Sequence, residues 1–168
     1  MANQKKHKKS LYKINDSFFR FYFRYILPNK SRIELGIKQP VIQIFLNDQN
    51  KFVAQVWEDL TRKAVPFLNV ENIQWDIASR WWGNGIDRKQ MEIDVVAESI
   101  DKKRLLVGEV KWSKNENPDA LLENLREKAM KAPFAQKKKI IPVLFLKSNN
   151  NYKKANTYTP VEVMQALK

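Results

Sequence analysis

The sequence contains no cysteine and no long apolar segment, and its first residues do not show the pattern expected of a secretory leader; each absence argues against a class of protein. Without cysteine there is no disulfide framework and no thiolate metal site. The apolar runs are a few residues long, far short of the ~20 residues that cross a bilayer. The start, MANQKKHKKS, is basic, but no apolar stretch of the signal-peptide type follows it. These features predict a cytoplasmic protein with no membrane partner.

Charge is the strongest feature of the composition. The 168 residues suit a single domain with one buried core, and they include 31 Lys and Arg against 18 Asp and Glu, a net charge of +13. A basic protein favours polyanionic partners, because each phosphate that it neutralises releases condensed counterions. The composition therefore predicts DNA as a partner, and the alternative is a basic domain with no nucleic-acid role.

The N-terminal residues divide into a tail and an aromatic segment. Residues 1–10 hold four lysines and the lone His7, and they are predicted to be a tail or the remnant of a linker. Residues 11–36 are predicted to be a helical extension, because six aromatic side chains fall between Phe18 and Tyr25. Aromatic side chains on nearly every side of a helix predict burial on more than one face. The alternative is a docking surface for another domain.

Local signals set the expected ends of the aromatic helix. Asp16 or Ser17 can cap its first turn, and the pair Pro28-Asn29 is predicted to end it.

Residues 40–168 show the pattern of a mixed α/β core, with helices packed on a small central sheet and no internal repeat. The elements expected along it are a helix over 40–64 with a break near 47–50, a strand over 73–82, a turn at 83–85, two strands within 91–112 joined by a turn at 101–104, a helix from Asn117 to Pro133, a strand over 139–146 that Pro142 weakens or places at an edge, a loop over 148–156, and a short helix over 161–168.

Acidic residues interrupt the two strands within 91–112. Since side chains two apart on a strand share a face, Leu105 and Val107 lead to Glu109 and Lys111 on one face. In the preceding strand Glu92 and Asp94 share a face, and Ile93, Val95 and Ala97 take the other. Pairing around the 101–104 turn would bring Asp94 near Glu109 and Lys111.

Two neighbouring carboxylates repel each other unless a proton or a cation joins them. A hard divalent ion such as Mg²⁺ or Mn²⁺ suits Asp94 and Glu109, with the backbone carbonyl of Val110 completing the protein ligands. Lys111 would then face a nucleophilic water or the scissile phosphate of a phosphodiester. The alternative is a salt-bridge ladder across two exposed strand faces.

These residues also resemble a known family. Asp94 with Glu109-Val110-Lys111 resembles the PD-(D/E)XK signature of the restriction-endonuclease-like superfamily, and EIDVVA…GEVK is similar to its Holliday-junction-resolvase-like and Mrr-like branches. Glu58, in VWEDL, matches the acidic residue on the first core helix of those branches. The leading proline of the signature is absent, since Ile93 precedes Asp94.

A closer resemblance covers most of the chain. The segments YKINDSFFRFYFRYILPNKSRIELG, VWEDL, RWWGN, EIDVVA and GEVKW together resemble the C-terminal nuclease-like domain of archaeal-type P-loop ATPases. The chain has no G-x-x-x-x-G-K-[ST] motif and so no ATPase site of its own. The resemblance begins near Leu11. It implies a restriction-endonuclease-like domain over residues 11–168 and a P-loop ATPase, as a domain or a subunit, for a partner.

The resemblance also implies roles for individual residues. Asp94 and Glu109 would be metal ligands, Lys111 the catalytic lysine, and Glu58 an outer-shell or second-metal acid. The implied activity is Mg²⁺-dependent endonucleolytic hydrolysis of DNA. The alternative is a catalytically weak or inactive module that binds nucleic acid or docks on the ATPase.

Outside this constellation, two groups of residues are candidates for DNA contact. Arg80 could bind a phosphate, and Trp81 or its neighbour Trp82 could stack on a base or sugar. The alternative is that one tryptophan packs in the core while the other covers the sheet edge. Lys137 and Lys138 could contact the phosphate backbone, and the alternative for them is a solvated face.

Overall fold

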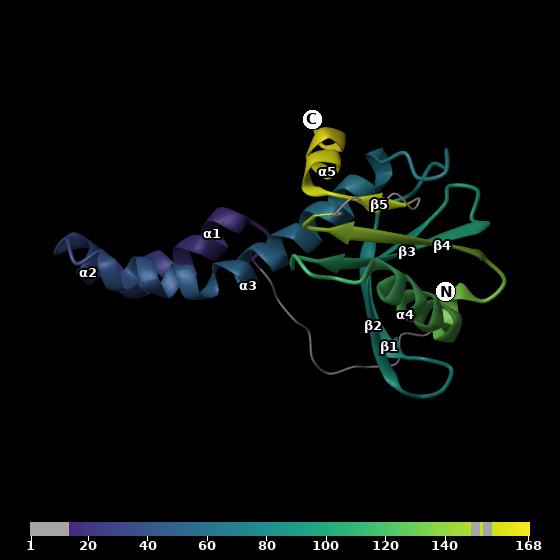
Figure 1. The fold of residues 1–168 in the computed structure, drawn as a ribbon, viewed down its shortest axis with the longest axis horizontal. Helices are drawn as coiled ribbons and strands as arrows, with labels where there is room; N and C mark the ends of the chain where they lie inside the picture. The colour runs from purple at the N-terminus through teal and green to yellow at the C-terminus, as the bar shows by residue number, and fades with distance from the viewer. Residues whose placement is uncertain (1–13, 149–151, 153–155) are drawn as a thin grey trace. The chain divides into compact units, whose positions relative to one another are not determined.

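The computed structural model describes residues 14–148, 152 and 156–168 (Figure 1). The predicted basic tail therefore lies outside the described residues, together with most of the 148–156 loop. The chain forms two compact units that divide between Gln49 and Asn50, called unit 1 and unit 2 below.

Unit 1 begins with a run of short helical segments. These are α1 (Ser17–Phe21), the π-helical turn η1 (Tyr22–Ile26), the 3₁₀ turn η2 (Leu27–Asn29) and α2 (Lys30–Glu34). Asp16 caps α1 as predicted, because its carboxylate accepts hydrogen bonds from the backbone N–H groups of Phe18 and Phe19 at 2.8 and 3.0 Å. Pro28 does not end the helical run as predicted. It lies in the first turn of η2, where its missing N–H breaks no helical hydrogen bond.

The aromatic side chains of unit 1 divide into a buried and an exposed set. Tyr25 is buried, packs edge-on against Phe45 with ring centroids 5.2 Å apart, and donates a hydrogen bond to Asp48 at 2.6 Å. Phe18 and Phe19, by contrast, are 67% and 50% exposed. The prediction that the aromatic segment packs in a core is therefore right for Tyr25 and wrong for these two phenylalanines.

Helix α3 (Gln39–Ala64) belongs to both units. It is continuous, so the break predicted near residues 47–50 is wrong. Polar residues there do not break the helix, because no proline or glycine interrupts its backbone hydrogen bonds. In unit 2, Trp57 of α3 is buried, and the 3₁₀ turn η3 (Val65–Phe67) follows the helix.

Unit 2 is built on a five-stranded mixed sheet in the order β1-β2-β3-β4-β5. Its elements are β1 (Ser79–Asn84), β2 (Gln90–Glu98), β3 (Arg104–Lys111), α4 (Pro118–Lys131), η4 (Pro133–Ala135), β4 (Lys139–Leu146), β5 (Thr157–Tyr158) and α5 (Pro160–Ala166). The first three strands are antiparallel, and β3, β4 and β5 are parallel. The predicted mixed α/β architecture with a small sheet and flanking helices is confirmed at this level.

Two local predictions before β2 are wrong in position. The strand expected over 73–82 starts only at Ser79, and before it the chain forms an isolated antiparallel bridge between Trp75 and Ser99. The turn expected at 83–85 lies over Gly85–Lys89, where Arg88 takes a positive φ of 62°. β1 thus continues through Gly83 and Asn84, where ladder pairing with β2 outweighs the turn preference of these residues.

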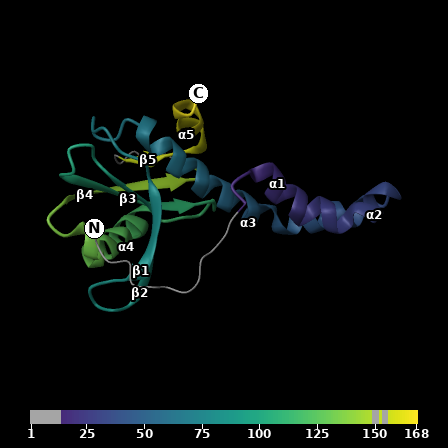
Figure 2. The ribbon, with the colours of Figure 1, turned by 180° about the vertical axis from the view of Figure 1, so that it is seen from behind.

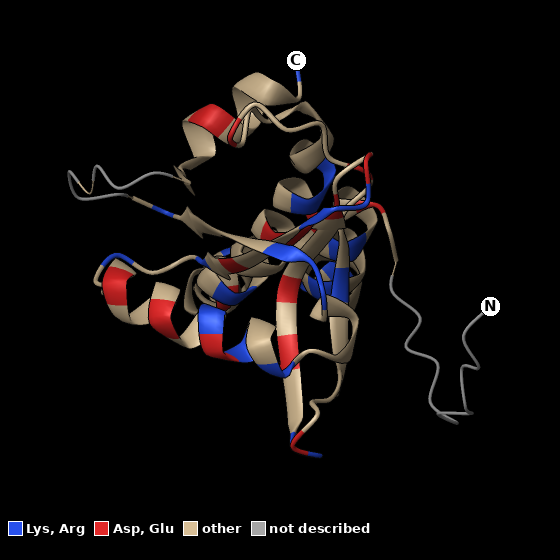
Figure 3. Ribbon diagram, turned by 90° about the vertical axis from the view of Figure 1, so that its right-hand side faces the viewer, with Lys and Arg blue, Asp and Glu red and all other residues tan. Residues whose placement is uncertain are grey.

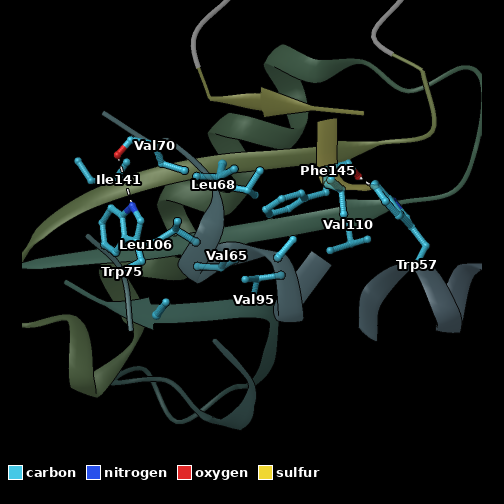
Figure 4. Close-up of a cluster of buried hydrophobic side chains, with 14 residues drawn as sticks. Trp57, Val65, Leu68, Val70, Trp75, Val95, Leu106, Val110, Ile141 and Phe145 are labelled. Atoms are coloured by element: carbon cyan, nitrogen blue, oxygen red, sulfur yellow. Dashed lines mark hydrogen bonds between the residues drawn. The ribbon is translucent and has the colours of Figure 1, made fainter. Parts of the chain in front are cut away.

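Helices cover both faces of the sheet (Figures 1 and 2). On one face, Trp57 and Val65 from the α3–η3 segment and Val163 of α5 pack on the sheet with Val110 and Phe145 (Figure 4). On the other face, residues of α4 and η4 pack on a second cluster. Unit 2 is therefore a three-layer α/β/α domain, with the site residues of β2 and β3 in its middle layer.

A β-bulge changes the side-chain alternation of β2. Ser79 pairs with Val96, but Trp81 pairs with Ile93, so β2 has one extra residue opposite Arg80. Consequently Ile93 packs in the α4-side cluster and Val95 in the α3-side cluster. The predicted common face for Ile93, Val95 and Ala97 is wrong for Ile93, and the bulge falls at Asp94 and Val95.

Pro142 lies in β4 opposite Val107 of β3, and the β4–β5 pairing covers only Leu144 and Phe145. Pro142 is thus outside the β5 pairing, in agreement with the predicted edge position. Within the described part of the chain, no helix combines the length and apolarity that a membrane span requires.

Candidate active site

The candidate site forms where β2 and β3 stop pairing. Their ladder covers Val95–Glu98 and Leu105–Gly108, and Asp94 is the first residue of β2 beyond it. Beyond the ladder, the Asp94 side chain contacts β3 in place of a backbone pair: its Oδ2 accepts a hydrogen bond from the backbone N–H of Val110 at 2.9 Å. Gly108 permits the strands to lie close before this point, since a Cβ there would lie 2.9 Å from the Cβ of Val95.

Asp94 lies in acidic surroundings. Its pKa is raised from 3.8 to about 6, first by burial and then by the charges of Glu109 and Glu58, against the opposing effects of the Val110 N–H and Lys111. The structure thus brings all four residues implied by the resemblance, Glu58, Asp94, Glu109 and Lys111, into one electrostatically coupled group. A cation would relieve the repulsion among the three acids.

Glu109 is the most enclosed acid of the group, with only 7% of its surface exposed. Its Oε1 lies 2.7 Å from Nζ of Lys111, and its Oε2 lies 3.0 Å from Nζ of Lys128 on α4. Burial alone would raise the pKa of Glu109, but the Lys111 hydrogen bond and the Lys128 charge outweigh it and lower the pKa. Glu109 is therefore ionised at neutral pH, and its strand face agrees with the predicted alternation in β3.

Lys111 stays protonated at neutral pH. Burial would lower its pKa, but the hydrogen bond and the charge of Glu109 outweigh burial and raise it. The Lys111 ammonium is therefore suited to stabilising negative charge rather than to removing a proton.

Arg62 fixes the acidic end of α3 to the bulge. Its guanidinium donates to the backbone carbonyl of Asp94 at 2.9 Å and to Asp59 at 2.7 Å, and it lies 3.7 Å from Glu58. Its side chain is only 14% exposed. Arg62 thereby holds both the Asp94 backbone and the Glu58 side chain in place.

A cleft of about 430 Å³ opens beside Glu109 and Lys111. It lies between β3 and α4, and its lining includes Glu109, Lys111, Asn117, Asn124 and Lys128. A second cleft of about 230 Å³ shares Asn124 and Lys128 with the first. A substrate that enters the first cleft would thus meet Glu109 and both lysines.

The donor set fits a hard divalent cation held by few protein ligands. In residues 14–148, 152 and 156–168, no three His, Asp or Glu side chains form a group that could hold a metal ion. Mg²⁺, however, usually takes only one or two carboxylates, with water completing its shell. Asp94, Glu109 and the Val110 carbonyl lie beside the end of the β2–β3 ladder and are the oxygen donors that such a site would use.

Arg80 and the two tryptophans lie on β1, beside the part of β2 that holds Asp94. Arg80 pairs with Glu92 at 2.5 Å, and its pKa is raised first by that hydrogen bond and further by the charges of Glu58 and Asp94. Trp81 packs edge-on against Phe134 with ring centroids 5.0 Å apart, as the packing alternative predicts, and Trp82 is 56% exposed. Trp82 therefore offers more of its ring for stacking than Trp81.

Lys137 and Lys138 lie away from this group. They precede β4, whose Lys139 pairs with Arg104, whereas Lys111 pairs with Leu146 at the other end of the same ladder. Lys138 also forms an ion pair with Glu98. The structure thus does not bring the lysine run together with the acids.

Sequence reasoning did not select Arg62 or Lys128. The helical i,i+4 spacing from Glu58 could have pointed to Arg62. In the sequence of α4, Lys128 lies between the buried residues Leu125 and Ala129. Only the packing of α4 on β3, however, shows that Lys128 contacts Glu109.

One family model and an archaeal relative match the chain. An uncharacterized protein of Methanocaldococcus jannaschii is 38% identical over 110 residues, which are 64% of this chain and 24% of that protein. The chain thus spans about a quarter of the length of this relative. No solved structure matches the chain significantly. The model of DUF234, archaeal and bacterial proteins of unknown function, matches residues 22–131, well over half of the sequence, and the chain belongs to that family.

Proposed function

We propose that unit 2 is a restriction-endonuclease-like domain that hydrolyses DNA phosphodiesters with Mg²⁺ or Mn²⁺. The observation that carries this proposal is the position of Asp94 and Glu109. The two acids lie on adjacent strands where the strands separate, with Lys111 beside them and Glu58 within electrostatic range. The crossover from β3 through α4 to the parallel strand β4 supports the restriction-endonuclease-like assignment, and the charge of +13 supports DNA as the substrate.

Each residue has a role in this reaction. Asp94, Glu109 and the Val110 carbonyl would hold the divalent ion, and Glu58 would serve as an outer acid. When bound, the ion polarises a phosphoryl oxygen and lowers the pKa of water. The Lys111 ammonium stabilises the negative charge that develops on the phosphate as water attacks phosphorus and the P–O bond breaks. Arg62 holds Asp94 and Glu58 in position.

Titration calorimetry with Mg²⁺ and Mn²⁺ tests the metal site. We expect the wild type to bind one of these ions and Asp94→Ala to lose binding, because the variant removes one of two carboxylate ligands. Asp76→Ala, at an exposed aspartate outside the site, is the matched control and should bind as the wild type does. Equal binding by Asp94→Ala and the control would refute the metal site.

Nicking of plasmid and branched DNA in Mn²⁺ tests the reaction. Lys111→Ala should lose cleavage by about 10²–10³-fold, the usual cost of removing one group that stabilises transition-state charge. It should retain its affinity for DNA. A wild type that cleaves no duplex, single-stranded or branched DNA would refute the activity.

The exposed aromatic surface of unit 1 favours a second candidate function, a docking module for a P-loop ATPase. Phe18, Phe19, Phe23 and Leu27 are all at least 45% exposed. Sedimentation of the chain with a purified P-loop ATPase of the same organism tests this candidate. Complex formation that Phe18→Ser and Phe19→Ser abolish supports it, and unchanged sedimentation of the two proteins refutes it.

A further inference from the structure

We propose that Lys128 is a second functional lysine of the site, which holds Glu109 while no divalent cation is bound and transfers to a DNA phosphate when a cation takes the carboxylate. This inference rests on the proposed function, because it assigns Glu109 to the cation and the cleft to DNA.

The first support is the sharing of one carboxylate by two cations. Lys111 lies 2.7 Å from Oε1 of Glu109 and Lys128 lies 3.0 Å from Oε2, so both carboxylate oxygens are occupied. The three side chains together carry one surplus positive charge. A divalent ion that approaches Glu109 meets two ammonium groups, and their repulsion weakens its binding unless at least one of them withdraws.

The second support is the difference between the two lysines in their contact with Glu109. Lys111 is two residues from Glu109 on the same strand, and pairing with β4 holds both residues in register. Lys128 comes from a different element, α4, and its contact with Glu109 is longer, at 3.0 Å against 2.7 Å for Lys111, while the two lysine side chains are similarly exposed, at 30% and 36%. Lys128 is therefore the lysine whose ammonium can leave at the lower cost.

The third support is the space around Lys128. Its side chain lines both the cleft of about 430 Å³ and the cleft of about 230 Å³, and Asn124, one turn earlier on α4, lines both as well. An ammonium released from Glu109 thus remains in the cleft that the substrate backbone would enter. A phosphate there can replace the lost carboxylate as its partner.

This exchange predicts opposite effects of one substitution on two ligands. Lys128→Gln removes the ammonium that competes for Glu109, so the affinity for Mn²⁺ should rise by about tenfold, the usual worth of one charged hydrogen bond. The same variant should bind a short DNA duplex more weakly, because it loses a phosphate contact. A residue that only supports the fold would not strengthen metal binding.

Calorimetry with Mn²⁺ alone and fluorescence anisotropy with a labelled duplex in Ca²⁺ measure the two effects. Lys131→Gln is the control for the metal, since it makes the same charge change one turn further along α4, at a lysine 3.7 Å from Asp87 rather than at Glu109. Lys128→Arg keeps the charge and should restore most of the DNA affinity. Thermal unfolding followed by circular dichroism verifies that each variant is folded.

The outcomes separate this inference from the proposed function. Tighter Mn²⁺ binding by Lys128→Gln than by Lys131→Gln, with weaker DNA binding, supports the exchange. Equal or weaker Mn²⁺ binding by Lys128→Gln in a protein whose wild type does bind Mn²⁺ overturns the exchange and leaves the proposed function standing. A wild type that binds no divalent cation overturns the proposed function, and the exchange with it.

Discussion

Asp94 shows how a site residue opposes the stability of the fold. Burial and the charges of Glu109 and Glu58 raise its pKa from 3.8 to about 6. The folded state therefore holds the Asp94 proton more tightly than the unfolded state does. Its contribution to stability is full below pH 3.8 and is lost as the pH rises through about 6. At neutral pH an ionised Asp94 destabilises the protein.

Asp94→Asn should therefore stabilise the protein at pH 8. The amide oxygen can still accept the Val110 hydrogen bond, while the charge that Glu109 and Glu58 repel is gone. The difference between a pKa of 3.8 and one of about 6 corresponds to an upper value of about 3 kcal/mol, so we expect a gain of about 1–3 kcal/mol in the free energy of unfolding at pH 8. The gain should nearly vanish at pH 4. Urea unfolding in EDTA at both pH values measures the difference.

Asp76→Asn is the control for this experiment, because Asp76 is exposed. The difference in free energy of unfolding between this variant and the wild type should be small at both pH values. A loss of stability in Asp94→Asn at pH 8, or an equal gain at both pH values, would contradict the acidic surroundings described for Asp94.

At the scale of elements, α4 connects the fold to the site, because it packs on the sheet and carries Lys128 to Glu109. Its first turn depends on Asn117, whose side-chain oxygen accepts hydrogen bonds from the N–H groups of Asp119 and Ala120 at 3.1 and 3.3 Å. Asn117→Ala should lower the free energy of unfolding by about 1 kcal/mol, the usual cost of a lost N-cap. Urea unfolding at pH 7 measures this loss.

Asn117→Asp is the matched variant for α4. Aspartate can cap the helix and also places a negative charge at its N-terminus, so this variant should be as stable as the wild type. Equal losses in the Ala and Asp variants would indicate that the loss does not come from capping.

Side-chain alternation predicts the faces of β3 correctly but not those of β2. Alternation in β3 placed Glu109 and Lys111 on one face correctly, because that strand is regular and buried. Alternation failed in β2, because the bulge at Asp94 inserts a residue that leaves no mark in the polar and apolar pattern. Proximity of Asp94 to Glu109 was predicted from the turn alone, and the bulge does not remove it.

Contacts between distant elements were beyond local patterns. The pairing of Lys128 with Glu109 depends on how the β3–α4–β4 crossover seats the helix on the sheet, which no spacing within α4 specifies. The exposure of Phe18 and Phe19 could not be predicted from local patterns either. A run of aromatic residues predicts burial, but it does not indicate which surface would bury the side chains.

At the scale of the whole molecule, a net charge of +13 coexists with many acids. Basic and acidic residues are interspersed along the helices and strands in Figure 3. The charge therefore does not by itself mark one binding face. The distance of each lysine from the candidate site distinguishes lysines that would affect the metal from lysines that would only add general affinity for DNA.

Distance makes this distinction testable for the lysines before β4. The ladder of β3 and β4 runs seven residues from the Arg104–Lys139 pair to the Lys111–Leu146 pair, roughly 23 Å at the usual rise per strand residue. This separation exceeds the Debye length of about 10 Å at 0.1 M salt. Lys137→Gln and Lys138→Gln should therefore leave the Mn²⁺ affinity unchanged in calorimetry.

The same two variants should differ from each other in the salt dependence of DNA binding. Lys137 is exposed, so its loss should make the slope of log K against log [KCl] less steep by about 0.9, the value of one phosphate contact. Lys138 is paired with Glu98, so Lys138→Gln should change the slope less. Anisotropy titrations of a labelled duplex in Ca²⁺ from 50 to 200 mM KCl, a range chosen because phosphate contacts weaken strongly across it, measure both slopes. A slope that neither variant changes would remove this end of the sheet from the DNA interface, and an altered Mn²⁺ affinity would show that the two ends of the sheet are coupled.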